Sequence, residues 1–147
     1  MVPASSSQEL AKVLSEHPEI RDIFIDGVER PVRRVSSTKN QKLFWKKEDP
    51  QKKNLTITSE SRILVLSKTK SGSVYNYRML KESGFMEILI LHALWMDLGF
   101  FGTKNDFPSH EIILPKKRPK KKELISKEKN DNRVISSLRV KVEHLFA

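Results

Sequence analysis

An apolar segment that ends in an acid and a glycine constrains the fold most. Residues 23–31 read Ile-Phe-Ile-Asp-Gly-Val-Glu-Arg-Pro, so β-branched and aromatic side chains precede Asp26. Such a run is typical of a strand, and we expect it to end at Asp26 and to present this carboxylate at the rim of a sheet. A simple Asp-Gly turn is the alternative, because that dipeptide is common in turns.

A second segment repeats this pattern. Residues 94–102 read Leu-Trp-Met-Asp-Leu-Gly-Phe-Phe-Gly, so Asp97 follows an apolar run and a glycine comes two residues later. The pattern predicts another strand that ends with a carboxylate, beside a backbone that glycine leaves free to bend.

The last segment of the chain has helical spacing. Apolar residues recur from Val134 to Phe146 at intervals of three and four, and Glu143 falls at the margin of that face. A strand over residues 140–142 is the alternative structure. The alternative role for Glu143 is an exposed carboxylate that pairs with Arg139 one turn earlier.

The remaining segments predict a sheet with covering helices. Serines that can cap a helix precede residues 10–14, which suggests a short amphipathic helix over residues 5–16. Residues 55–58 alternate as a strand does, and the nearly continuous apolar run over residues 62–67 predicts a central strand that is buried on both faces. Residues 77–91 can supply a helix that covers the sheet, and residues 112–114 a further short strand. Residues 43–45 are aromatic, but Pro50 interrupts that pattern soon afterwards.

Composition indicates a polyanionic partner. The 147 residues suit one domain, and 28 Lys and Arg against 18 Asp and Glu give a formal charge of +10. Nucleic acid is a commoner partner of such a protein than an anionic membrane surface. The absence of cysteine excludes disulfides and zinc fingers of the cysteine type. The longest apolar run, residues 88–96, is too short to span a bilayer and the first residues lack signal-peptide features, so we expect a cytoplasmic, DNA-associated protein with no membrane partner.

Two basic segments are candidates for contact with phosphates. The first is a turn-rich connection that contains Arg33 and Arg34. The second, residues 115–122, has six basic residues in eight and includes Lys116, Lys117, Arg118 and Lys120. Its two prolines and its self-repulsion predict an exposed loop. A solvated charge run, or one that resembles a nuclear-targeting signal, is the alternative to a DNA contact.

Several motifs together resemble one family. They are residues 25–31, residues 67–74 with the sequence Ser-Lys-Thr-Lys-Ser-Gly-Ser-Val, residues 95–100, residues 114–120 and, most specifically, residues 128–144. From about residue 24 to residue 144 the chain resembles the DDE transposases of the insertion-sequence 5 type, which are bacterial members of the DDE superfamily of endonucleases. The resemblance implies an RNase H-like α/β fold, with a mixed central sheet flanked by helices, over residues 21–147, after an N-terminal helical remnant at residues 1–20.

The resemblance also implies a chemistry. Asp26, Asp97 and Glu143 match the family's three catalytic acids, which bind divalent metal ions, Mg²⁺ or Mn²⁺. Hard oxygen ligands on three separate elements suit two such ions, and metal-assisted in-line displacement at phosphorus would cleave DNA and transfer its strands. The implied partners are the DNA ends of an insertion element and a second transposase chain, either a copy of this one or a full-length relative.

The chain also departs from the family pattern. Residues 44–51 replace the family's usual basic strand, and Tyr75-Asn76 stands where the family usually shows His-Asp. The segment before Asp26 is too short for the family's helix-turn-helix region, and the chain stops four residues after Glu143. We therefore expect a copy that is truncated and incomplete at its C-terminus, and whose activity is open. The alternatives are a basic DNA-binding remnant without catalysis and an RNA-binding protein.

Overall fold

The computed structural model describes residues 3–31, 51–60 and 62–143. The expectations for residues 43–45 and for Arg33 and Arg34 lie outside these residues. The elements follow one another along the chain as α1 (Ser7–Glu16), β1 (Asp22–Pro31), β2 (Gln51–Thr58), β3 (Ile63–Leu66), β4 (Lys70–Ser71), α3 (Asn76–Ser83), α4 (Phe85–Ile88), β5 (Ala93–Trp95), the 3-10 helix η1 (Leu98–Phe100), α5 (Thr103–Asp106), β6 (Glu111–Ile113) and α6 (Ser126–Glu143).

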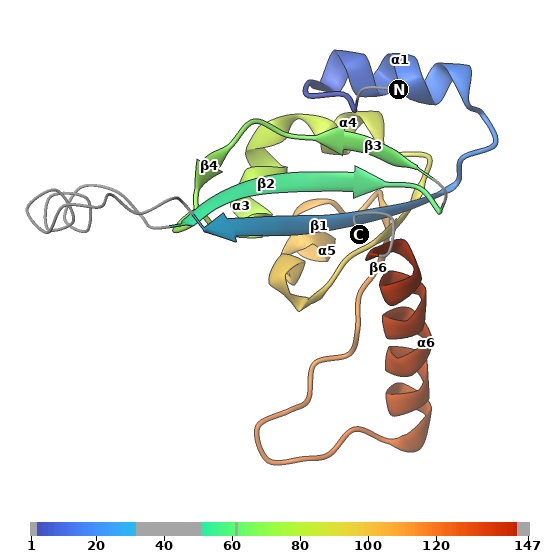
Figure 1. Cartoon of the computed structure of the whole chain (residues 1–147). Helices are drawn as coiled ribbons and strands as arrows, with labels where there is room; N and C mark the ends of the chain where they lie inside the picture. Colours follow the sequence, from blue (N-terminus) through green and yellow to red (C-terminus); the bar gives the residue numbers. More distant parts are fainter. Residues whose placement is uncertain (1–2, 32–50, 61, 144–147) are drawn as a thin grey trace, which may run out of the picture.

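The described strands form one mixed sheet. Its order is β3-β2-β1-β5-β6, and the short β4 pairs with β2 beside β3. β1 is antiparallel to β2 and parallel to β5, which is parallel to β6. The mixed sheet together with its helices confirms the predicted α/β class and is consistent with an RNase H-like fold (Figure 1).

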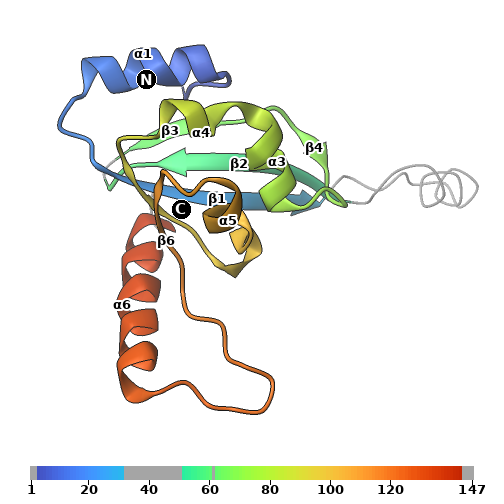
Figure 2. The same cartoon turned by 180° about the vertical axis from the view of Figure 1, so that it is seen from behind.

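The hydrophobic core lies on one face of the sheet, under α1, α3 and α4. Ile23, Leu94 and Ile112 form a row across β1, β5 and β6, and each is buried. Side chains from α3 and α4, among them Leu80 and Phe85, complete the core. Figures 1 and 2 show α3 and α4 against the sheet, with α1 beside the β3 edge and α6 extending away below β6.

Two expectations about strands are wrong. β1 continues through Asp26 and Gly27 to Pro31, so Asp26 lies within a strand and neither ends it nor forms a turn. β3 is at the edge of the sheet and not central. Its apolar character has another cause, because the N-terminal segment covers that edge: Ala4 accepts a hydrogen bond from Leu66 and donates one to Leu64.

The helices agree more closely with the predictions made from the sequence. The segment predicted to cover the sheet forms two helices, α3 and α4, because Gly84 adopts a positive φ of 79° between them, a conformation that glycine accommodates without a steric penalty. Helix, and not strand, is confirmed for the last segment, where α6 extends to Glu143. Its apolar face is only partly covered, since Ile135 is buried whereas Val134 and Val140 are about half exposed.

Candidate acid site

Asp26 and Asp97 follow equivalent positions of two neighbouring parallel strands. Phe24 of β1 is in register with Trp95 of β5, and each acid comes two residues after its member of that pair. Because side chains two apart on a strand share a face, Asp26 lies on the face of the sheet that carries Phe24 and Trp95. β5 ends at Trp95 while β1 continues, so both acids lie at the edge where β5 stops. The register thus places the backbone of these two predicted site residues at the same edge of the sheet.

The backbone that follows each acid orients its carboxylate. The N–H of Gly27 donates a hydrogen bond of 2.8 Å to Oδ1 of Asp26. The N–H of Gly99 donates one of 2.9 Å to Oδ1 of Asp97, which caps the start of η1. The two aspartates therefore share one type of local restraint, a carboxylate oxygen held by a backbone donor close behind it.

The cross-strand neighbour of Asp26 on β2 is a buried threonine. Thr56 is 1% exposed, and its hydroxyl donates a hydrogen bond of 3.2 Å to the main-chain carbonyl of Asp26. The strand that carries the acid is thereby held on the β2 side by side-chain as well as main-chain hydrogen bonds.

Glu143, the third predicted acid, is the last residue of α6, and its side chain lies outside the described part of the chain. Among the residues whose side chains are described, no group of three or more His, Cys, Asp or Glu could hold a metal ion. α6 is hydrogen bonded to the segment that follows β6, because the Asn132 side chain accepts a hydrogen bond from the main chain of Lys116, 2.8 Å, and donates one back, 3.1 Å.

The second basic segment begins at the same edge of the sheet. It follows β6, which is parallel to β5, and its four candidate DNA-binding residues, Lys116, Lys117, Arg118 and Lys120, are exposed, as predicted. Nζ of Lys117 lies 5.8 Å from the centre of the Phe101 ring, four residues after Asp97. Lys116 forms an ion pair of 3.2 Å with Glu128.

Asn76 and Lys53 were not among the predicted site residues. Asn76 begins α3 and packs against Gly27, next to Asp26. The sequence showed it only as a departure from the family pattern. Lys53 is buried on β2, where it forms an ion pair of 3.1 Å with Glu29 and donates a hydrogen bond to the carbonyl of Val74. No sequence signal could have found it, because it sits in a run of polar residues, Gln51 to Asn54.

Comparison with known proteins identifies the family of this chain. The profile of the family described as DDE superfamily endonuclease matches residues 25–147. The chain therefore belongs to the DDE superfamily of endonucleases.

One similar protein is the "Probable transposase for insertion sequence element IS702" of Microchaete diplosiphon, with 31% identity over 144 residues. The match covers 94% of this chain and 48% of the relative, so the chain spans about half the length of that protein. No solved structure gives a significant match. In the described residues, no helix combines the length and the apolar character needed to cross a membrane.

Proposed function

We propose that this chain is the catalytic part of a metal-dependent DNA transposase, an endonuclease and strand transferase whose acids are Asp26, Asp97 and Glu143. The observation that carries the proposal is the register of β1 and β5, in which each of Asp26 and Asp97 follows, by two residues, a member of the pair Phe24 and Trp95.

The donor set fits a divalent cation of the Mg²⁺ type. Carboxylate oxygens are the ligands that Mg²⁺ and Mn²⁺ prefer, and Asp26 and Asp97 supply them from a rigid sheet edge. Glu143, the last residue of α6, would add a third carboxylate. A bound Mg²⁺ would supply Lewis-acid stabilisation of the charge that develops at phosphorus.

The protein's own part in the reaction is to position its acids and to hold DNA. The backbone donors of Gly27 and Gly99 fix the orientation of the two carboxylates before the substrate binds. Such preorganisation means that no free energy is spent on ordering the carboxylates during binding. The four exposed cations of the second basic segment would bind the phosphates of the DNA, with Arg33 and Arg34 as further proposed contacts. Such contacts give affinity and register without reading the bases.

The proposal also covers which DNA the protein acts on. A transposase of the insertion-sequence 5 type would act at the ends of its element, and it would work beside a second transposase chain. The similarity to the IS702 protein supports the broader assignment, a transposase that works on DNA.

Nicking of supercoiled plasmid DNA tests the proposal. The full chain should convert supercoiled to relaxed plasmid in the presence of Mg²⁺ and not in EDTA, and this activity should disappear in Asp26→Ala and in Asp97→Ala. Nicking that both variants retain would refute the assignment of the acids.

A basic DNA-binding protein without catalysis is the second candidate. The observation that favours it is Asn76, an amide where the family usually has an acid, packed directly behind Asp26. Salt-sensitive duplex binding that is equal in the original chain and in both alanine variants, with no cleavage in any of them, would favour this candidate. Tighter binding to structured RNA than to duplex DNA would instead support an RNA-binding protein.

A further inference from the structure

The side chain of Asn76 lies between the two backbone segments that carry the acids. A Cβ added to Gly27 would lie 2.6 Å from Cγ of Asn76, and one added to Gly99 would lie 3.6 Å from its Nδ2. Gly27 directly follows Asp26, and Gly99 comes two residues after Asp97. One short side chain thus packs against the first segment and lies close to the second, and it comes from a different element, the first turn of α3.

This close approach accounts for the glycine at position 27. Among the described glycines only Gly84 has a positive φ, so the backbone at Gly27 has a conformation that any residue can adopt. The first atom of any larger side chain would overlap the Asn76 amide. Glycine at position 27 thus leaves the space that Asn76 occupies, and a larger residue there would displace the Asn76 side chain.

Packing, and not hydrogen bonding, holds the Asn76 amide. Its Oδ1 is buried and has no hydrogen-bond partner within the described part of the chain. A buried acceptor without a partner costs stability, so the amide adds nothing to the fold through this atom. What fixes the side chain is its contact with Gly27 and the anchoring of the helix from which it projects.

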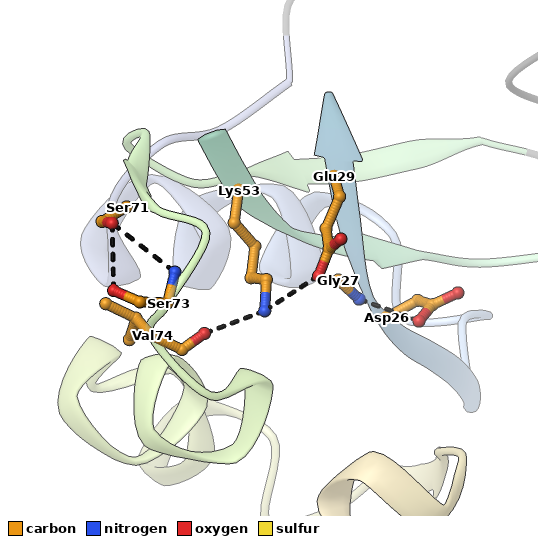
Figure 3. A network of polar contacts seen from close by, with 7 residues as sticks. All are labelled: Asp26, Gly27, Glu29, Lys53, Ser71, Ser73 and Val74. Carbon is orange, nitrogen blue, oxygen red and sulfur yellow. Dashed lines mark hydrogen bonds and ion pairs between the residues drawn. The ribbon is translucent and has the colours of Figure 1, made fainter. Parts of the chain in front are cut away.

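Lys53 anchors the start of that helix. Its ammonium group donates a hydrogen bond of 2.9 Å to the carbonyl of Val74, two residues before Asn76, and lies 3.1 Å from Glu29 of β1 (Figure 3). Lys53 itself is 7% exposed. Two strands and the helix start are thus joined through one buried charge, and β1 is the strand that carries Asp26.

We propose that Asn76 is a positioning residue: its planar amide, clamped through Lys53, acts as a spacer behind Gly27 and Gly99 and sets the separation of Asp26 from Asp97. The inference rests on the proposed function, because it takes the two aspartates as one cation site. Asn76 itself does not contact the cation; it acts through the backbone of the two glycines.

A compensating pair of substitutions at positions 76 and 27 tests whether Asn76 acts as a spacer. The full chain and three variants, Asn76→Ala, Gly27→Ala and the double variant, are titrated with Mn²⁺. Each single variant should weaken Mn²⁺ binding about tenfold or more, the size usual for residues that orient metal ligands. In the double variant the methyl group introduced at position 27 fills the space that Asn76 vacates, so its affinity should return to within about threefold of the original chain, a strongly non-additive result.

Two results of this titration would overturn the inference. One is a single Asn76→Ala variant that binds Mn²⁺ as tightly as the original chain. The other is a double variant no better than Asn76→Ala, because the amide would then act through its polar atoms and not as a spacer. Asn105→Ala, which removes an exposed asparagine from α5, is the matched control and should change nothing.

A spectroscopic readout separates this inference from the proposed function. If the original chain does not bind Mn²⁺, the proposed function fails, and amide chemical shifts in metal-free protein still test the spacer. Asn76→Ala should shift the amide signals of both Gly27 and Gly99, whose N–H groups hold the two carboxylates. An unchanged Gly99 signal would mean that Asn76 does not link the two segments.

Discussion

Phe24 stacks on Trp95 across β1 and β5, with ring centroids 5.7 Å apart and planes inclined by 19°. The two residues are in register, and each lies two positions before an acid, Asp26 or Asp97. Trp95 is fixed further by its indole N–H, which donates a hydrogen bond of 3.0 Å to Asp22. This aromatic pair holds the two strands together directly below the candidate acid site.

Trp95→Leu should therefore lower the free energy of unfolding by about 1.5–3 kcal/mol, since it removes both the stacked pair and the indole hydrogen bond. Trp95→Phe keeps a stacking ring and should lose only about 1 kcal/mol. Urea denaturation measures both values. Equal losses in the two variants would show that the stacking contributes little.

Lys53 and Glu29 should contribute unequally to the free energy of unfolding, although they form an ion pair with each other. Lys53→Met keeps the apolar stem but leaves the Val74 carbonyl without its donor, and should cost about 1–3 kcal/mol. Glu29 is half exposed, and the amide oxygen of a glutamine can still accept a hydrogen bond from the Lys53 ammonium group, so Glu29→Gln should cost less, about 1 kcal/mol. Denaturant unfolding compares the two variants, and a larger loss for Glu29→Gln would contradict the role given to the Val74 contact.

His92 should make the fold less stable in acid. Burial of its imidazole holds the pKa of His92 below the usual 6.5. Between that lowered pKa and 6.5 the unfolded chain binds more protons than the folded one, so the free energy of unfolding should fall as the pH drops through 6.5 and should level off below the folded pKa. His92→Gln should remove this part of the pH dependence in denaturation measured from pH 5 to 8. An unchanged pH profile in the variant would contradict the assignment.

The second basic segment should determine much of the salt dependence of DNA binding. Each lysine or arginine that neutralises a phosphate contributes a slope of about −0.9 to the plot of log K against log salt. Replacing Lys117 and Lys120 by alanine should make the slope shallower by up to about 1.8 on duplex DNA of any sequence. Lys127→Ala, at an exposed position near the start of α6, is the control. An unchanged slope would mean that this segment is a solvated charge run that does not contact the DNA phosphates.

The sequence predicted the kinds of elements well where the pattern was long. Helix α1, the strands at residues 55–58 and 112–113, the exposed basic segment and the helical α6 follow from hydrophobic period and charge, which are local properties. The α/β class followed from the resemblance, and the sheet confirms it.

The errors came from contacts that a local pattern does not contain. The apolar run of β3 indicated a central strand, but the residue that covers it, Ala4, lies about 60 positions earlier in the chain. The Asp26-Gly27 dipeptide suggested the end of a strand, whereas Gly27 lies within β1 and leaves space for Asn76 of α3. The positions of Asp26 and Asp97 at one edge of the sheet follow from strand register, which spacing along the sequence could not reveal.

The central claim is that Asp26 and Asp97 form one cation site, and calorimetric titration of the full chain with Mn²⁺ tests it most directly. Asp26→Asn and Asp97→Asn should each weaken binding at least about tenfold, because each removes a charge that attracts the ion at close range. The double variant should be little worse than either single variant, since the two carboxylates share one ion, and Asp131→Asn on α6 should bind normally. Binding that survives both single substitutions unchanged would contradict the claim.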